Sequence, residues 1–290
     1  MLADSELILN QDGSIYHLNL LPKDIANTIV LVGDPERVVQ VSSFFDSIEI
    51  KKRKREFVTH TGYLNKKRIS VISTGIGTDN IDIVLNELDA LVNIDFKTRQ
   101  IKKELTSLDL VRIGTSGSIQ PDIKIDSFLI SRWALGFDNL PYFYAGQVSE
   151  KEFIKEDFLK YTDWYEEKSK PYVVGADTVF LNQFVSERTT LGFTATAVGF
   201  YGPQSRKLRL SRQDPHLNEK LATVDFKNFK VTNLEMETAG IYTMSKLLGH
   251  RAVSLNCILA NRPNKSFSSN PNESINKLIE YTLNRLVKEV

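Results

Sequence analysis

The sequence predicts a single α/β domain built on a central, mixed β-sheet that is flanked by helices. Two observations predict this fold. Apolar, β-branched runs alternate with segments of helical periodicity, and no Pro/Gly/Ser-rich linker divides the 290 residues. Composition agrees, since 41% of the residues are hydrophobic and 25% are charged, as in ordinary globular domains. We therefore expect one domain over residues 1–290.

Eight segments have the composition of β-strands, being short runs rich in valine, isoleucine and threonine between turn-forming residues. They lie at Thr28–Val32, Phe57–Leu64, Arg68–Ser73, Asp109–Ile113, Ser127–Trp133, Pro171–Val174, Leu191–Val198 and Ala252–Leu259. Several are followed directly by a segment of helical periodicity, which is why we expect helices to pack on the sheet that these strands form.

Six segments place apolar residues at helical spacing. They are Pro35–Phe45, Asn80–Val92, Thr98–Leu105, His216–Ala222, Met236–Leu248 and Glu273–Val287. Proline suits the first helical position, which places the start of the first helix at Pro35. Asparagine and serine cap helix starts, so Asn272 or Ser274 is expected near the start of the last helix. The preceding stretch, Arg262–Glu273, is predicted to be a surface loop because it is rich in proline, serine and asparagine.

Charge and hydropathy exclude several classes of function. The formal net charge is +1, which gives no general attraction to nucleic acid or to an anionic membrane. No stretch approaches the roughly 20 apolar residues that cross a bilayer, and the N-terminal residues are acidic where a signal peptide is basic. We therefore expect a cytoplasmic protein with neither nucleic acid nor a membrane as a partner.

Two local features have ordinary structural interpretations. Cys257 is the only cysteine and lies in the apolar run Val253–Ala260, so we expect a buried small hydrophobe and no disulfide within the chain. The basic run Lys51–Arg55 is expected to form a solvated strand or a subunit edge, because no aromatic interleaving or basic excess accompanies it. No metal site is predicted.

Three glycine-containing turns directly follow predicted strands: Gly33–Arg37, Ser73–Gly77 and Arg112–Gly117. Glycine lets backbone N–H groups approach a ligand closely, and a guanidinium group matches an oxyanion with two parallel hydrogen bonds. Strand ends of an α/β sheet converge at one edge, where ligands of this architecture bind. The turns predict an anion site at that edge; the alternative is ordinary glycine turns whose arginines pair with surface carboxylates.

The segment Gly199–Arg206 offers an aromatic ring, an amide and a guanidinium group within a few residues. An amide can match the edge of a flat heterocycle while Phe200 covers its face. This pattern favours a site for a heterocyclic base. The alternative is a surface loop whose aromatic side chain only packs against its neighbours.

The segment Asn233–Glu237 is expected to open the helix Met236–Leu248, with Thr232 or Asn233 as the cap. Glutamates in a first helical turn also interact favourably with the helix dipole, whatever their function. Residues two apart on a helix point about 200° away from each other. We therefore expect only one of Glu235 and Glu237 to face a ligand, and we select Glu237.

Together these motifs resemble the nucleoside phosphorylase family, most of all its uridine phosphorylases. In chain order they are Gly33–Arg37, Arg55–Phe57, Ser73–Gly77, Arg112–Gly117, Phe200–Arg206, Asn233–Glu237 and Asn261–Arg262. The likeness extends from about Tyr16 to the last helix, and the ordered set is far more specific than any one motif. It implies the α/β fold of that family and phosphorolysis of a pyrimidine ribonucleoside, in which uridine and phosphate give uracil and ribose 1-phosphate for nucleoside salvage.

The resemblance also implies a role for each matching residue. Inorganic phosphate, the co-substrate, would be held by Gly33, Arg37, Arg112 and Thr115, and by Arg55 from a neighbouring subunit. The ribose would contact Thr115, Met236, Glu237 and, from a partner subunit, His17. The base would contact Phe200, Gln204, Arg206 and Arg262. Arg112, Glu237 and Arg206 would be the catalytic residues. Because phosphate is the nucleophile, neither a protein nucleophile nor a cofactor is expected.

Three departures from the family pattern stand out. The segment Asn93–Thr106 looks like a lysine-rich insertion, predicted to be helical, to which no function is assigned. Some relatives bind a monovalent cation between subunits at positions like Glu56, Ile76 and a serine; Asn80 replaces that serine, which argues against the ion here. Asn261 stands where purine-specific relatives have an aspartate, which favours a pyrimidine substrate.

Other functions stay open. A purine or broad-specificity phosphorylase, a nucleoside hydrolase of the same fold, and a nucleoside-binding protein without turnover would share much of this pattern. The arginines at positions 37, 55 and 112 favour phosphate over water as the nucleophile. Because Arg55 and His17 would reach a partner's site, the resemblance implies a homo-oligomer, either a dimer or a hexamer.

Overall fold

The computed structural model describes residues 1–147, 149–225 and 229–288. Its strands are β1 (Thr28–Val32), β2 (Ser47–Lys54), β3 (Phe57–Leu64), β4 (Lys67–Ser73), β5 (Ile94–Asp95), β6 (Gln100–Ile101), β7 (Asp109–Ser118), β8 (Phe128–Gly136), β9 (Tyr172–Gly175), β10 (Thr189–Thr196), β11 (Val231–Glu235), β12 (Arg251–Asn261) and β13 (Ser266–Phe267). Its α-helices are α1 (Pro35–Ser42), α2 (Thr78–Asn93), α3 (Glu152–Thr162), α4 (Thr178–Asn182), α5 (Leu217–Thr223), α6 (Thr238–Leu248) and α7 (Pro271–Val287). Short 3-10 helices lie at Pro22–Asp24, Leu140–Phe143 and Gly202–Gln204.

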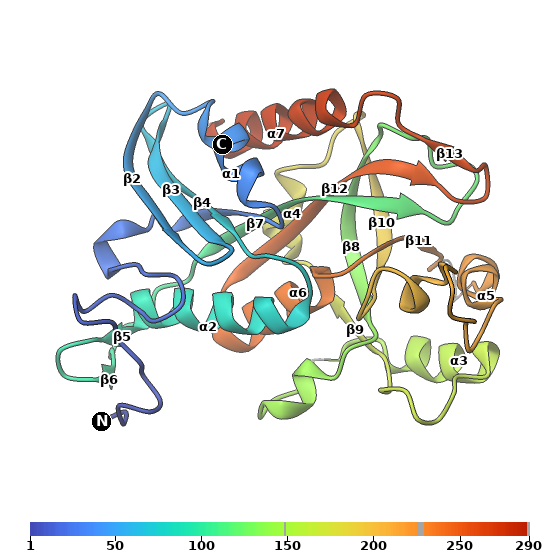
Figure 1. Ribbon diagram of the computed structural model, residues 1–290, viewed down its shortest axis with the longest axis horizontal. Helices are drawn as coiled ribbons and strands as arrows, with labels where there is room; N and C mark the ends of the chain where they lie inside the picture. The colour runs from blue at the N-terminus through green and yellow to red at the C-terminus, as the bar shows by residue number, and fades with distance from the viewer. Residues whose placement is uncertain (148, 226–228, 289–290) are drawn as a thin grey trace.

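One mixed sheet of 11 strands dominates the molecule, in the order β13-β12-β8-β10-β11-β7-β1-β4-β3-β2, with β9 paired to β8 (Figure 1). The predicted α/β fold with a central mixed sheet is therefore confirmed. The strand path also closes on itself, because β12 pairs with β7 in parallel as well as with β8. Strands β7, β12, β8, β10 and β11 thus form a closed ring, from which β1, β4, β3 and β2 extend as a wing.

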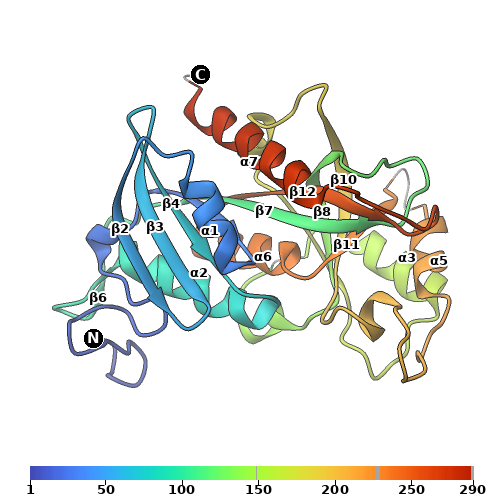
Figure 2. The ribbon, with the colours of Figure 1, turned by 45° about the horizontal axis from the view of Figure 1, so that its top comes forward.

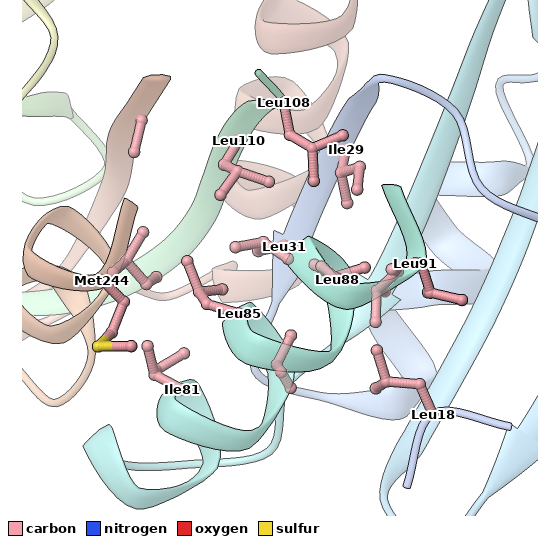
Figure 3. Close-up of a cluster of buried hydrophobic side chains, with 14 of the residues drawn as sticks. Leu18, Ile29, Leu31, Ile81, Leu85, Leu88, Leu91, Leu108, Leu110 and Met244 are labelled. Atoms are coloured by element: carbon pink, nitrogen blue, oxygen red, sulfur yellow. The ribbon is translucent and has the colours of Figure 1, made fainter. Parts of the chain in front are cut away.

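Helices cover both faces of the sheet. On one face, α2 and α6 pack through a cluster that joins Leu85 and Leu88 to Ile29 and Leu31 of β1 (Figure 3). On the other face, α1, α4 and α7 pack through a second cluster that includes Val30 of β1. Figure 2 shows α2 and α7 on opposite sides of the strands. Because β1 is buried on both sides, it has a continuous apolar run instead of an alternating one.

The prediction of a helix over Thr98–Leu105 is wrong. The segment Asn93–Thr106 instead contains a hairpin of β5 and β6. Asp95 Oδ1 accepts hydrogen bonds from the backbone N–H groups of Lys97 at 2.8 Å and Thr98 at 2.9 Å. An aspartate that bonds to the N–H groups just after it closes a turn and competes with helix formation.

The insertion also holds the start of the chain. Arg99, at the hairpin turn, donates hydrogen bonds from Nε to the carbonyl oxygen of Leu2 and from Nη2 to that of Ala3, both at 2.9 Å. Nη2 also donates to the carbonyl oxygen of Leu7, a buried residue. The hairpin therefore anchors the N-terminal segment.

Helix α6 begins later than predicted. Thr232 and Asn233 lie in β11, where Asn233 pairs with Ser118 of β7 and Thr194 of β10, so neither residue caps a helix. The first helical residue is Thr238, and Glu237 is the N-cap residue. Backbone pairing to two neighbouring strands outweighs the local capping signal in this segment.

Several other elements differ from the prediction. Helices α3 and α4 and strand β11 were not among the predicted elements, and β2 begins before the basic run in which a strand was expected. Helix α7 begins at Pro271 after Asn270, earlier than Asn272 or Ser274. Strand β2 carries most of the basic run at the edge of the sheet with its residues partly or fully exposed, which confirms the solvated-strand interpretation. Cys257 is buried, as expected.

The described parts of the chain contain neither a membrane-spanning helix nor a cluster of metal ligands. No helix among residues 1–147, 149–225 and 229–288 is long and apolar enough to span a membrane. In the same ranges, no three or more histidine, cysteine, aspartate and glutamate side chains group as metal ligands would.

Candidate active site

A cavity of about 800 Å³ opens at the carboxyl ends of β1, β4, β11 and β12, alongside β7. The three glycine turns converge here, since Gly33, Gly75 and the run 114–117 all line it. Of the predicted site residues, Gly33, Arg37, Arg112, Thr115, Phe200, Gln204, Arg206, Met236 and Glu237 line the cavity. His17, Arg55 and Arg262 are not part of its lining.

Arg37 lies in the first turn of α1, and the residues at the start of this helix favour helix initiation. Asp34 is the N-cap residue and its Oδ1 accepts from the N–H of Glu36 at 2.9 Å, while Pro35 occupies the first helical position. The Nε of Arg37 is buried and has no hydrogen-bond partner among the described residues. Burial, and then the nearby charge of Arg112, lower the pKa of Arg37. A partly buried guanidinium whose Nε lacks a partner and which lines a cavity is suited to an anionic ligand.

Arg112 extends from β7 along the same strand, over the Cα of Gly114. A Cβ atom at position 114 would lie 1.9 Å from Nη1 of Arg112, so only glycine leaves room for this conformation. Nη1 donates to Asn256 Oδ1 at 2.9 Å and approaches Ser254 Oγ at 3.4 Å. Within the motif Arg112–Gly117, Gly114 thus leaves the space that the long side chain of Arg112 occupies.

Both glutamates of the segment 235–237 contact Arg112, which corrects the expectation that only one would face the site. Nη2 of Arg112 lies 2.5 Å from Glu237 Oε2 and 3.1 Å from Glu235 Oε2. Glu235 ends β11 and Glu237 precedes α6, so the 200° separation of a helix does not apply to them.

The two carboxylates have different tasks. Glu235 accepts hydrogen bonds from the N–H groups of Glu237 and Thr238 and from Thr196 Oγ1, so it holds the start of α6. Glu237 Oε1 instead accepts from the N–H of Gly77, the N-cap residue of α2, at 2.9 Å. Glu237 therefore bridges the Ser73–Gly77 turn and Arg112 at the cavity wall.

Burial sets the electrostatics of this cluster. Desolvation raises the pKa of Glu237, and the Arg112 charge opposes that shift without cancelling it. Desolvation also acts against the charged form of Arg112, yet Glu235 and Glu237 raise the pKa of Arg112 above its ordinary value. Arg112 therefore stays cationic, and the carboxylates supply its counter-charge in this structure.

A further wall of the cavity comes from the loop after β10. Arg206 Nη1 donates to Gln204 Oε1 at 2.6 Å and to the carbonyl oxygen of Phe200 at 2.7 Å, and its guanidinium lies 3.8 Å from the centre of the Phe200 ring. Because Arg206 donates to the side-chain oxygen Oε1 of Gln204, the side-chain NH₂ of Gln204 remains available as a donor. This wall is therefore rich in hydrogen-bond donors.

Arg262 lies behind this wall. Its Nη1 donates to the carbonyl oxygen of Gln204 at 2.5 Å, so it holds the turn without lining the cavity. Burial, together with the charges of Arg206 and Arg212, lowers the pKa of Arg262 to about 10. Asn261 is also outside the lining: its Nδ2 donates to the carbonyl oxygen of Ile123 at 2.7 Å.

His17 and Arg55 lie on neighbouring segments, and neither residue is in the cavity lining. Glu87 of α2 accepts from the N–H of His17 and lies 2.7 Å from His17 Nδ1. Arg55 forms the turn between β2 and β3, and the adjacent Lys54 donates to the carbonyl oxygen of Tyr16. Two of the three predicted residues outside the cavity lining, His17 and Arg55, thus lie next to residues that are bonded to each other.

Several residues that shape the site were not among the predicted site residues. Asn256 and Ser254 form hydrogen bonds with Arg112. Ser116 lines the cavity between Thr115 and Gly117. One feature of the sequence points to Asn256: it is an amide inside the apolar run Val253–Ala260. A polar side chain that is buried there needs a hydrogen-bond partner. Its partner, Arg112, is 144 residues away and could not be inferred.

The closed mixed sheet and a cavity that combines buried guanidinium groups with a carboxylate pair define an α/β protein of the phosphorylase class. The chain belongs to the Phosphorylase superfamily, whose family model matches residues 27–289.

Individual relatives agree with that assignment. The chain is 30% identical over 257 residues to a uridine phosphorylase of Thermococcus kodakarensis, covering 89% of this chain and 81% of that protein. It is 27% identical over 240 residues to a DeoD-type purine nucleoside phosphorylase of Listeria welshimeri, covering 82% and 84%. Among solved structures it is similar to a Trypanosoma brucei nucleoside phosphorylase that shows uridine phosphorylase activity, with a TM-score of 0.89, 28% identity and coverage of 97% and 99%.

Proposed function

We propose that this protein is a pentosyltransferase that cleaves pyrimidine ribonucleosides with phosphate, converting uridine to uracil and ribose 1-phosphate. One observation carries the proposal: Arg37 and Arg112 meet the donor-rich wall of Phe200, Gln204 and Arg206 in a single cavity, with Glu237 also in its lining. An anion, a sugar and a flat base need these kinds of group within one cavity. The similarity to uridine phosphorylases of Thermococcus kodakarensis and Trypanosoma brucei points to the same substrate.

The reaction transfers the ribosyl group from the base to phosphate. The bond between C1′ and N1 of the base breaks and its electron pair leaves with the base, while a phosphate oxygen bonds to C1′. By analogy with glycoside chemistry, the sugar passes through an oxocarbenium-like transition state. Phosphate is the nucleophile, so the chain needs no cofactor for this step.

Each wall of the cavity stabilises one part of that transition state. Arg37, Arg112, Thr115 and the backbone at Gly33 would hold phosphate below C1′, which turns a bimolecular encounter into an oriented one. The NH₂ of Gln204 and the guanidinium of Arg206 would stabilise the negative charge that collects on the carbonyl oxygens of the departing base, with Arg262 behind them. Phe200 would cover the face of the base.

Glu237 would accept hydrogen bonds from the ribose hydroxyls, beside Met236, which also lines the cavity. In this structure Glu237 is bonded to Arg112 and to Gly77. Binding of phosphate to Arg112 would relieve part of that interaction and free a carboxylate lone pair for the sugar. The site is thereby suited to bind the anion and the nucleoside together.

We also propose that the protein works as a homo-oligomer, a dimer or a hexamer, with shared active sites. Arg55, at the turn between β2 and β3, and His17, before β1, are predicted site residues that do not line their own cavity. Glu87 bonds His17, and Lys54 bonds the carbonyl oxygen of Tyr16, so both segments are held in place. A partner subunit would insert Arg55 toward phosphate and His17 toward the 5′-hydroxyl.

A purine nucleoside is the second candidate substrate, because the chain is also similar to a DeoD-type purine nucleoside phosphorylase. Asn261 would not select the base by direct contact, since it is outside the cavity lining and its Nδ2 donates to the carbonyl oxygen of Ile123. Base preference would therefore depend on Gln204 and Arg206. Their donors suit the two carbonyl oxygens of uracil. We place the reaction in nucleoside salvage in the cytoplasm.

Release of free base from uridine and from inosine, measured with and without phosphate, tests the proposal. Uracil release that requires phosphate is the expected result. Preferential cleavage of inosine would instead assign the enzyme to purines, and release without phosphate would make it a hydrolase. Binding without release would make the protein a nucleoside sensor.

A further inference from the structure

Arg112 and Asn256 meet across two paired strands. In the parallel pairing of β7 with β12, Ser254 is the register partner of Arg112. Asn256 is the register partner of Gly114 in the same pairing. Residues two apart on a strand lie on one face of the sheet. Because Gly114 has no side chain, Arg112 extends into its place and its guanidinium group reaches Asn256. The contact between the two side chains therefore follows from the strand register.

The five N–H donors of the Arg112 guanidinium group are unequally used. Two belong to each Nη atom and one to Nε. Nη1 donates to Asn256 Oδ1 at 2.9 Å and lies 3.4 Å from Ser254 Oγ. Nη2 contacts the carboxylates of Glu235 and Glu237. Nε forms no hydrogen bond with any residue that the structure describes. Asn256 and Ser254 thus engage one nitrogen of the three.

The amide of Asn256 has a single orientation. A guanidinium group donates and cannot accept, so the amide must present its oxygen to Arg112. Its NH₂ then donates to Ser131 Oγ at 3.3 Å and to Ser254 Oγ at 3.4 Å. Asn256, Ser131 and Ser254 have no exposed surface. Rotating the amide would leave buried polar groups without partners at both ends, so Nη1 has a fixed acceptor.

This bond leaves Arg112 with one edge for an anion. A guanidinium group binds an oxyanion best through two parallel N–H bonds from adjacent nitrogens. Because Nη1 is held by buried groups, the remaining pair is Nε and Nη2. Nη2 also donates to Glu237, which lines the same cavity. An anion bound at this edge would therefore lie beside Glu237.

The neutrality of Asn256 is a second property of this contact. Arg112 carries one positive charge and already contacts two buried carboxylates, those of Glu235 and Glu237. An aspartate at position 256 would supply the same acceptor oxygen but would add a third negative charge close to the anion site. Like charges repel strongly where water is excluded. An amide therefore anchors Nη1 without opposing the binding of an anion.

We propose that Asn256 is a positioning residue for phosphate, which fixes Nη1 of Arg112 so that Nε and Nη2 form the edge that binds the anion. The inference rests on the proposed function and deepens it. Asn256 is outside the cavity lining and would act only through Arg112.

Binding of inorganic phosphate alone, measured by calorimetry, tests the proposal. Asn256→Ala should weaken phosphate binding about ten- to a hundredfold, as loss of a hydrogen bond to a charged group does. Asn256→Asp should also weaken it, because this variant keeps the acceptor but adds a charge. Asn93→Ala is the matched control and should bind phosphate like the wild type. Asn93 is another buried asparagine, outside the cavity lining, whose Nδ2 donates to Asp89 Oδ1 at 2.6 Å.

A double-mutant cycle with Arg112→Lys separates positioning from a general structural effect. An ammonium group has no planar edge to orient, so adding Asn256→Ala to Arg112→Lys should not weaken phosphate binding further. A crystal structure of the wild type with phosphate is the second readout. The anion should contact Nε and Nη2 of Arg112 while Nη1 stays bonded to Asn256.

Phosphate binding of wild-type strength in Asn256→Ala would overturn the proposal, and so would a phosphate bound at Nη1 with Asn256 displaced. An equal loss with and without Arg112→Lys would give Asn256 a merely structural role. Wild-type binding in Asn256→Asp would overturn the argument from neutrality.

Uridine turnover by the wild type is assayed separately, so that the two proposals fail independently. If uridine is cleaved with phosphate but Asn256→Ala binds phosphate normally, only this inference fails. If phosphate binding depends on Asn256 but uridine is not cleaved, only the proposed function fails.

Discussion

Nη2 of Arg112 donates a hydrogen bond to Glu237 Oε2 at 2.5 Å, across the join between β7 and the start of α6. The two residues belong to different proposed subsites, one for phosphate and one for ribose. Their contact means that neither subsite is independent of the other. A change at either residue should therefore alter the binding of both substrates.

Replacing Gly114 with alanine should disable the site without a change at any charged residue. The new Cβ would lie 1.9 Å from Nη1 of Arg112, which must move out of its pocket. Displacing a positioned charge of this kind costs about 10²-fold in rate. Steady-state kcat/KM for phosphate measures the loss. Gly202→Ala is the control, because nothing lies within 4 Å of a Cβ built there. Equal activity of the two variants would contradict the packing described for Arg112.

Replacing Arg112 with alanine should remove activity and also lower stability. Glu235 and Glu237 would be left buried, close to each other and without their cation. Breaking a buried ion pair by removing one partner costs about 3–5 kcal/mol. Urea unfolding followed by fluorescence measures the difference. Adding Glu237→Gln to Arg112→Ala should recover part of that stability but no activity, and a double variant less stable than Arg112→Ala would argue against this account.

Activity should decline on the acidic side as Glu237 takes up a proton. Burial raises the pKa of Glu237, so the decline should begin at a higher pH than for an exposed glutamate, whose pKa is about 4.3. The sign for stability is opposite: a carboxyl whose pKa is raised in the folded state favours folding at low pH and disfavours it above that pKa. Glu237→Gln should therefore flatten the acidic limb of kcat/KM at a much lower rate, while keeping or raising the melting temperature at neutral pH. An acidic limb unchanged in Glu237→Gln would assign the titration to another group.

Shared active sites predict complementation between two inactive variants. Arg55→Ala removes the side chain that would reach the neighbouring subunit's site. Arg37→Ala removes a phosphate-binding side chain from the chain's own site. In a randomly mixed dimer, about a quarter of all sites would contain both wild-type residues. Co-expression of the two variants, followed by assay of the purified mixture, should thus restore about a quarter of wild-type activity. A mixture no more active than either parent would rule out sharing through Arg55.

The thiol of Cys257 should be inert in the folded protein. It is buried in β12 and burial raises its pKa to about 12, so almost no thiolate forms at pH 8. A chromogenic disulfide reagent should detect no thiol in the native protein and one per chain after denaturation. Rapid reaction of the native protein would show that this strand opens.

Many residues of the site could be predicted from the sequence because the motifs that contain them are short. The strand–turn–helix pattern at Gly33–Arg37 and the grouping in Gly199–Arg206 need only neighbouring residues, and parallel strands bring their carboxyl ends to one edge in any α/β sheet. This is why most of the predicted residues line one cavity. Local patterns also misled: Thr98–Leu105 has helical spacing, yet Asp95 closes a turn before it.

The sequence by itself determined the alternation of strands and helices, the glycine turns and the kinds of side chain available to a ligand, because these depend on short-range spacing and on steric limits of the backbone. Only the tertiary structure decided that both Glu235 and Glu237 reach Arg112, that Asn256 holds it by a hydrogen bond, and that Arg55 and His17 do not line their own cavity. The reason is physical. The ring closes by pairing β12 with β7, and the direction of hydrogen bonds inside it depends on donors and acceptors that meet only after that closure.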